Sequence, residues 1–161
     1  MRLTLFVVGF ALLVAACSPG ASEATPPANQ AAAAVHPASG LAVIALTVTH
    51  GQTRHSFRVE LAATTQDQAK GLMFRTSMAP DEGMIFPMNP PRGASFWMRN
   101  TVIPLDIIFV GPDGRITNIA AGAIPYDERP LSSAELVKGV LELGGGRAAQ
   151  LGIVAGDVVE W

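Results

Sequence analysis

The sequence predicts a mainly β protein, a single small β-sandwich or barrel-like domain with one or two short helices. Two observations predict this fold class. Apolar residues make up 49% of the 161 residues and charged residues only 15%, which supports a buried core and excludes a disordered chain. Short runs rich in β-branched and aromatic residues also recur between Gly and Pro residues. About eight short strands with little helix are typical of sandwiches and barrels.

The first two predicted strands form a hairpin. Residues 41–50 are rich in β-branched side chains, which favour strands. Gly51-Gln52 supplies a turn, and residues 54–61 then alternate between apolar and polar. A period of two marks a strand with one buried face. The polar face of this second strand would carry Arg54, Ser56, Arg58 and Glu60.

The signals for the remaining elements are shorter. Thr65 and Gln68 stand three residues apart, which fits a capping box and predicts a short helix through Ala69 to about Leu72. Pro112-Asp113-Gly114 predicts a turn between two strands. The further strands are expected at 84–88, 95–98, 105–110, 115–121, 137–143 and 157–161, with a helical turn near 148–151.

The N-terminus predicts export and lipid anchoring. Residues 3–16 follow Arg2 without a charge, and a helix of that length reaches about 21 Å, short of the roughly 30 Å hydrocarbon core. Residues 1–16 therefore predict a signal peptide and not a spanning helix. The run ends at Val14-Ala15-Ala16-Cys17, which resembles the bacterial lipobox. This resemblance implies that Cys17 is diacylated and anchors the protein in a membrane.

Residues 17–40 are expected to form the lipidated Cys17 and a disordered tether, and residues 41–161 the folded domain. The tether contains four prolines, an alanine run and one charge, so it cannot bury enough surface to offset its backbone entropy. His36 within it is expected to have no role. Together these features predict a periplasm-facing lipoprotein of the cell envelope. Ser18 after the cysteine is typical of outer-membrane lipoproteins in diderm bacteria.

Charge and cysteine content exclude several classes of function. The chain has 11 basic and 13 acidic residues, a net charge of -2, so it lacks the basic excess that nucleic-acid binding requires. One cysteine excludes an intramolecular disulfide, a Cys-rich zinc site and an iron–sulfur cluster. His50 and His55 flank the turn at 51–52, but such histidines are far commoner without a metal than with one. No cofactor and no metal site is predicted.

Several stretches of the chain form a recognisable pattern. They are Gly71–Arg75, Gly83–Phe86, Phe96–Thr101, Ile103–Phe109, Asp113–Ile116, Leu141–Leu143, Gly152-Ile153 and Gly156-Asp157. With these stretches the chain resembles the bacterial and archaeal family known as domain of unknown function 192, over essentially all of residues 43–161. The Trp97–Thr101 stretch is the most specific part. The resemblance implies a mainly β domain that is often secreted or lipid-anchored, and it brings no established activity, substrate or catalytic residue.

Polar residues set into an apolar stretch, residues 96–109, form the candidate binding site. An ionised Asp106 in a strand that is buried on both faces needs a partner, and Arg99 or Arg75 could supply one as a bidentate fork. Two interpretations stay open: a structural ion pair with turn hydrogen bonds, or the polar floor of a pocket walled by Trp97 and Phe96. The candidate ligand-binding residues are Arg75, Trp97, Arg99, Asn100, Thr101 and Asp106.

The favoured function is a non-catalytic binding or accessory module for a small envelope ligand or a saccharide. Mixed aromatic and polar residues suit such ligands, and no nucleophile elbow is present. One alternative is an envelope-acting hydrolase or lyase, with Asp106 as acid or base and Arg99 and Asn100 stabilising negative charge. Glu142 is the carboxyl to test as a partner of Asp106.

A further alternative is copper handling. Five methionines fall between residues 73 and 98, and thioethers are soft ligands that suit Cu(I). Methionine is also a flexible filler of apolar cores, and no Met-x-x-Met spacing occurs in the chain. The sequence therefore favours binding over catalysis and core packing over copper, and leaves both alternatives open.

Overall fold

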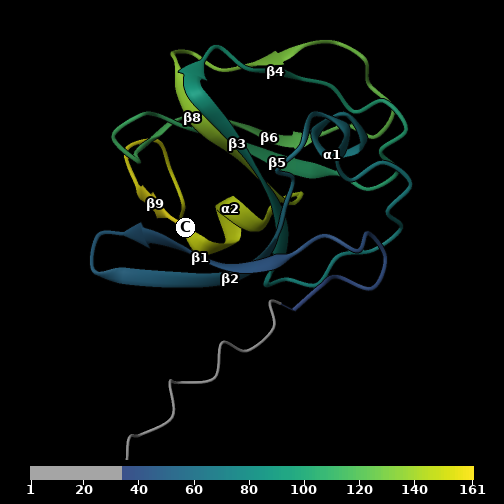
Figure 1. The fold of residues 1–161 in the computed structure, drawn as a ribbon. Helices are drawn as coiled ribbons and strands as arrows, with labels where there is room; N and C mark the ends of the chain where they lie inside the picture. Colours follow the sequence, from purple (N-terminus) through teal and green to yellow (C-terminus); the bar gives the residue numbers. More distant parts are fainter. Residues whose placement is uncertain (1–33) are drawn as a thin grey trace, which may run out of the picture. The chain divides into compact units, whose positions relative to one another are not determined.

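Nine strands and two short helices form residues 34–161, the part of the chain that the structure, a computed structural model, describes (Figure 1). The predicted signal peptide, Cys17 and residues 17–33 of the predicted tether lie outside the described residues. The elements are β1 (Val43–His50), β2 (Thr53–Leu61), α1 (Thr65–Lys70), β3 (Glu82–Arg92), β4 (Ser95–Phe96), β5 (Leu105–Val110), β6 (Ile116–Ala123), β7 (Leu131–Ser132), β8 (Val137–Gly144), α2 (Arg147–Leu151) and β9 (Val158–Glu160).

Seven of these strands form one mixed sheet in the order β6-β5-β8-β3-β2-β1-β9, and β4 pairs with β7 in a second, two-stranded sheet. β2 and β3 run parallel, and the other paired neighbours run antiparallel. A single bridge from Arg115 to Val158 brings β9 next to the start of β6, so the sheet curves strongly without a ladder that closes it into a barrel among the described residues. The predicted fold class, a single small mainly β domain with two short helices, is confirmed.

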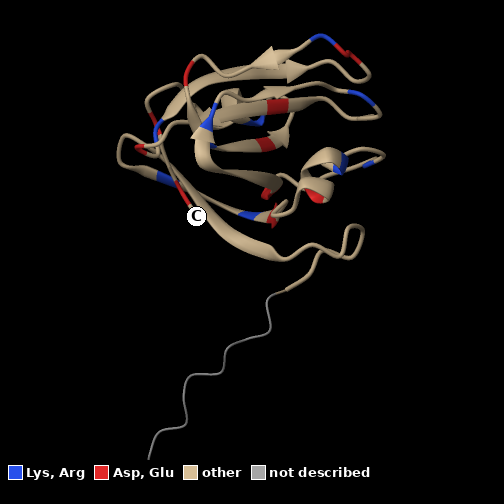
Figure 2. Cartoon of the chain, turned by 45° about the horizontal axis from the view of Figure 1, so that its top comes forward, with Lys and Arg blue, Asp and Glu red and all other residues tan. Residues whose placement is uncertain are grey.

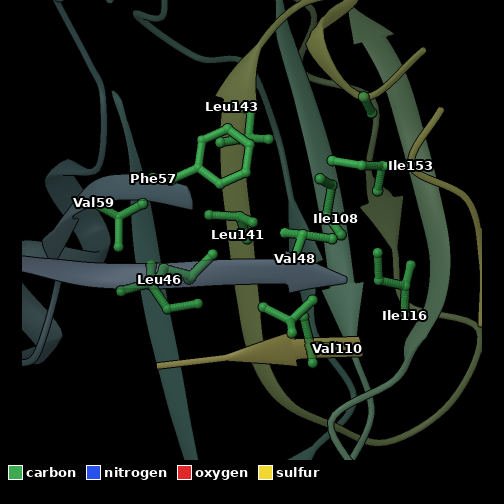
Figure 3. Close-up of a cluster of buried hydrophobic side chains, with 13 residues drawn as sticks. Leu46, Val48, Phe57, Val59, Ile108, Val110, Ile116, Leu141, Leu143 and Ile153 are labelled. Carbon is green, nitrogen blue, oxygen red and sulfur yellow. The ribbon is translucent and has the colours of Figure 1, made fainter. Parts of the chain in front are cut away.

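Apolar side chains cover both faces of the large sheet. Neighbouring residues of a strand point to opposite faces, and on β5 Ile108 belongs to a first core cluster whereas Ile107 belongs to a second. β8 divides in the same way between Leu141 and Val140. Figure 3 shows the first cluster, where side chains from β1, β2, β5 and β8 converge. The central strands are therefore buried on both sides, which explains their almost continuous apolar sequence.

Strand β2 departs from the predicted pattern at one residue. The hairpin with β1 turns at Gly51-Gln52 as expected, with His50 opposite Thr53. Glu60, which the alternation places on the polar face, is only 2% exposed. Nη2 of Arg75 lies 2.8 Å from one carboxylate oxygen of Glu60 and 3.0 Å from the other. This ion pair satisfies the buried charge, so Glu60 belongs to the interior.

The N-cap of helix α1 lies one residue earlier than predicted. The N-cap is Thr64 and not Thr65: its hydroxyl accepts from the amide of Asp67 at 3.1 Å, and the carboxylate of Asp67 accepts from the amide of Thr64 at 3.2 Å. An ionised carboxylate is a stronger acceptor than the side-chain amide of Gln68, which explains the shift. Gln68 instead donates to the carbonyl of Pro87 at 2.9 Å and so ties α1 to β3.

Residues 34–40 contact the domain although the sequence places them in the tether. Val35 bridges to Ala42, and Nδ1 of His36 lies 3.7 Å from the carboxylate of Glu60. His36, expected to have no role, therefore packs beside the Glu60–Arg75 pair. Among the described residues, no helix has both the length and the apolar character needed to cross a bilayer.

Candidate functional site

A hollow of about 320 Å³, here called the α1 pocket, opens between α1 and the second core cluster. Its lining comes from Gln68–Met73 at the end of α1, from Phe86 and Met88 of β3, from residues 92–97, from Arg99 and Thr101, and from Glu142 of β8. The volume lies at the lower end of the range for small-molecule sites. Three of the predicted site residues, Trp97, Arg99 and Thr101, line this pocket.

The wall of the α1 pocket is aromatic and rigid. The rings of Phe86 and Phe96 pack edge to face with centroids 5.0 Å apart, and Phe96 packs in the same way on the buried ring of Phe109 at 6.3 Å. Such pairs stabilise each other beyond their buried area. After Phe86, β3 loses its regular pairing with β8 between Pro87 and Arg92, a segment that contains three prolines, which have no amide hydrogen to donate.

Glu142 forms the floor of the pocket. It stands in β8 opposite Met84 of β3 and Ile107 of β5, both fully buried, and is itself only 5% exposed. Within residues 34–161, no hydrogen bond or ion pair reaches its carboxyl group. Burial raises the pKa of Glu142 to about 8 because the charged form loses its hydration. The carboxyl is therefore largely protonated at neutral pH and holds a hydrogen-bond donor toward the pocket.

The mouth of the pocket carries three exposed cations, Lys70, Arg92 and Arg99. Most Lys, Arg, Asp and Glu residues lie in loops and at strand ends, as Figure 2 shows. The guanidinium of Arg99 lies 5.5 Å from the centre of the Trp97 ring, and its Nε lies 3.8 Å from Glu128. In the part of the chain that the structure describes, Lys70 and Arg92 take part in no ion pair. Their charges remain available at the mouth.

A tight turn, residues 98–101, places the polar residues of the wall. The amide of Thr101 donates to the carbonyl of Met98 at 3.0 Å, and Asn100 has the left-handed φ of 56° that Asn tolerates. Asn100 is not part of the pocket lining, but its side chain donates to the sulfur of the lining residue Met73 at 3.7 Å. Asn100 thus links the turn to the segment after α1, whereas Thr101 lines the pocket.

Asp106 is buried and hydrogen-bonded to the backbone, as a residue with a structural role would be. It is fully buried, and its carboxylate accepts from the amides of Gly122 at 2.8 Å, Gly146 at 3.0 Å and Ala148 at 2.8 Å. Neither Arg99 nor Arg75 pairs with it. In the sheet it stands opposite Leu143 of the first cluster. Asp106 therefore joins the end of β6 to the turn before α2 and to the first residues of α2, and the expected pocket floor is not formed by this residue.

The two buried carboxyls of the central strands do not meet. Asp106 points to the face of the first core cluster, whereas Glu142 stands opposite Ile107 and points to the face of the second. A glycosidase needs two carboxyl groups across one cleft, so these two cannot form such a pair. Arg75 also lies outside the lining of the α1 pocket, in its ion pair with Glu60.

Three of the five methionines between residues 73 and 98 are core residues, and His50 has an acidic neighbour. Met84, Met88 and Met98 are buried in the second core cluster, as the core interpretation predicts. Nδ1 of His50 lies 3.0 Å from the carboxylate of Asp157. Across residues 34–161, no group of three or more His, Cys, Asp or Glu side chains is arranged to hold a metal ion.

Comparison with known proteins gives the family. Residues 46–161 match the family DUF192, which is described as an uncharacterized ACR. The chain belongs to the DUF192 family. No protein with a curated description matches this DUF192 chain.

Two solved structures resemble the DUF192 chain over most of its length. One is a protein of unknown function from Novosphingobium aromaticivorans, with 63% identity over 82% of this chain and 94% of the other, at a TM-score of 0.79. Another, from Sinorhizobium meliloti, is described as "a putative transcription regulator"; it shares 38% identity over 74% of this chain and 94% of its own, at a TM-score of 0.72.

Sequence reasoning missed the residues at the two ends of the pocket. The sequence suggests Glu142 only as a partner of Asp106, and it does not single out Lys70 or Arg92. The signal for Glu142 was present, because an acid between Leu141 and Leu143 breaks the apolar pattern of a strand that is buried on both faces. No local pattern indicated Lys70 and Arg92, which only the folding of β3 beside α1 brings to one opening.

Proposed function

We propose that this DUF192 domain binds a small envelope ligand, such as a saccharide, in the α1 pocket without transforming it. Glu142 is the single observation that carries the proposal. A buried polar group without a hydrogen-bond partner costs stability, and a fold that only needed packing would place an apolar side chain there. Glu142 is 5% exposed and makes no hydrogen bond or ion pair within residues 34–161. It is not among the fully buried side-chain atoms without a partner, of which the described residues hold one, Nε2 of His55, so the small exposed part of Glu142 lies where a ligand in the pocket would reach it.

The rest of the lining suits a ligand of mixed character. Trp97 is 48% exposed and offers a flat apolar surface with an indole donor. The hydroxyl of Thr101 is committed only to the carbonyl of Arg99, at a long 3.4 Å. A few convergent polar groups in an otherwise apolar hollow are typical of small-molecule sites.

The contents of the pocket favour binding over catalysis. Glu142 is the one acidic residue among the described residues that line it, and a protonated acid needs a base or nucleophile to complete hydrolysis. Asp106, the acid or base of the hydrolase alternative, is sealed on the other face of the sheet. The Sinorhizobium protein is described as "a putative transcription regulator", but we do not extend nucleic-acid binding to this chain. Its net charge of -2 lacks the basic excess that such binding uses.

We propose further that acylation of Cys17 anchors the domain at the periplasmic side of an envelope membrane. The support is the match of residues 14–17 to a lipobox after an uncharged run that is too short to span a bilayer. The tether would then hold the α1 pocket near envelope ligands.

A ligand screen against two variants tests the binding function. The purified full chain is soaked or titrated with a library of sugars, peptides and small envelope metabolites, and binding is followed by crystallography and ligand-observed NMR. Glu142→Leu should abolish binding of every hit because it removes the donor, whereas the matched control Glu160→Gln changes an exposed carboxyl outside the pocket. Hits that occupy another surface, or that bind Glu142→Leu normally, would refute the proposal.

A further inference from the structure

We propose that the ligand of the α1 pocket is an acidic saccharide. Its anionic group would bind Lys70 and Arg92 at the mouth, and an oxygen of its sugar ring would accept a hydrogen bond from Glu142 at the floor. This inference rests on the proposed binding function and adds the chemical class of the ligand.

The distribution of charge in the pocket carries the first half of the inference. Four charged or titratable side chains line it, the cations Lys70, Arg92 and Arg99 at the exposed mouth and Glu142 at the buried end. Arg99 already stacks on Trp97 and faces Glu128. Lys70 and Arg92, which have no ion-pair partner within residues 34–161, are free to bind an anion.

This cationic mouth stands out against the composition of the protein. The chain has more acids than bases, and it contains only two lysines, one of which is Lys70. Cations that converge on one opening create a local field that attracts and orients an anion, whatever the net charge of the whole protein.

The floor of the pocket carries the second half. From β3 and β5, Glu142 faces only the apolar side chains of Met84 and Ile107, and the charged groups of the pocket lie at its mouth. A protonated carboxyl there donates to an uncharged acceptor such as a sugar hydroxyl or ring oxygen. An amine would have to pass three cations and then ionise a desolvated acid, so cationic ligands are disfavoured.

The aromatic wall indicates a ring between these two ends. Phe86 and Phe96 are fixed edge to face, and Trp97 remains half exposed beside them. The C–H face of a pyranose packs against a flat exposed ring such as that of Trp97, while its hydroxyls reach the polar groups around it. Thr101 and Gln68 also line the pocket. The side-chain NH2 of Gln68 donates to the carbonyls of Ala62 and Pro87, so its side-chain oxygen is the group that can accept from a sugar hydroxyl.

Calorimetric titration with four sugars tests the ligand class. The full chain is titrated with glucose, glucuronate, glucose 6-phosphate and glucosamine at low salt. At least one of the two anionic sugars should bind about tenfold or more tightly than glucose, because charge-assisted contacts from two cations are lost with the neutral sugar. The two anionic arms distinguish a carboxylate from a phosphate.

Variants identify which end of the pocket is responsible. Lys70→Ala with Arg92→Ala should bring the affinity for the anionic sugar to within about threefold of that for glucose, whereas the control Arg54→Ala, an exposed cation outside the pocket, should keep the preference. Glu142→Gln retains a donor and should keep binding, and Glu142→Leu should lose it.

The outcomes separate the two proposals. If glucose binds as tightly as the anionic sugars and Glu142→Leu abolishes binding, the pocket function stands and the acidic class is refuted. Tightest binding of glucosamine, or an anion preference that survives the double alanine variant, also refutes it. If none of the four sugars binds, the saccharide inference is overturned, and the screen with the broader library decides the binding function by itself.

Discussion

Replacing Glu142 with Gln should stabilise the protein, and the gain should grow as the pH rises. Burial raises the pKa of this carboxyl from an ordinary 4.5 to about 8. Between these two pH values the unfolded chain has released a proton that the folded protein still holds. The free energy of unfolding of the natural protein therefore falls as the pH rises through this window, and the loss is complete above the folded pKa. Gln has nearly the same shape and never ionises.

The size of the effect follows from the two pKa values. Each pKa unit corresponds to about 1.4 kcal/mol, so the linkage relation gives an upper bound of about 3 kcal/mol at pH 7 and almost nothing below pH 4. The bound at pH 7 is a large part of the roughly 5–15 kcal/mol that stabilises a typical domain. Since Glu142 is 5% exposed, little solvent screening reduces it.

Urea unfolding of the full chain at pH 5 and pH 8, followed by tryptophan fluorescence, measures this difference. The advantage of Glu142→Gln over the natural protein should increase by a few kcal/mol between the two pH values. The control Glu160→Gln removes an exposed carboxyl on β9 and should show no such increase. An advantage of Glu142→Gln that is equal at both pH values would refute the view that Glu142 is a desolvated, unpartnered acid.

Three further predictions concern the rest of the chain. Asp106→Ala should destabilise the fold by about 3 kcal/mol or more, since it removes a charged acceptor from three backbone amides, of which that of Ala148 is buried; unfolding at neutral pH measures this, and a loss under 1 kcal/mol would contradict the bracing role. Arg75→Ala should cost about 3–5 kcal/mol because it leaves the buried charge of Glu60 unpaired, and Glu60→Gln in the same background should recover part of that loss. Cys17→Ser should move the protein from the detergent phase to the aqueous phase in detergent partitioning; an unchanged distribution would argue against the lipid anchor.

The sequence predicts the strands well wherever both faces are buried. The strand expected at 105–110 matches β5, and the strand expected at 137–143 ends one residue short of β8. Their apolar runs between Gly and Pro are local signals that tertiary contacts reinforce. The two-residue strand β7 was not predicted, because it exists only through its pairing with β4, some 35 residues earlier in the chain.

The candidate site was predicted only in part for the same reason. Trp97, Arg99 and Thr101 lie close together in sequence, so one polar interruption of an apolar stretch reveals them. Glu60 and Arg75 pair across a helix and a loop, and Lys70 and Arg92 line one pocket although they lie 22 positions apart in the sequence. Such tertiary arrangements depend on the path of the chain, and no local pattern in the sequence predicts them.

The surroundings of the two buried acids in the central strands indicate a structural role for one and a binding role for the other. Asp106 and Glu142 stand on neighbouring strands, and in the sequence each interrupts an apolar strand. Asp106 receives three backbone amides at 2.8–3.0 Å, so its hydrogen-bonding capacity is used within the fold. Glu142 receives none within residues 34–161 and faces a hollow. A carboxyl that accepts several hydrogen bonds from the backbone holds the fold together. A carboxyl without hydrogen bonds beside a pocket is available to a ligand. Glu142 is therefore the residue on which binding experiments should concentrate, and Asp106 is a residue to leave intact in them.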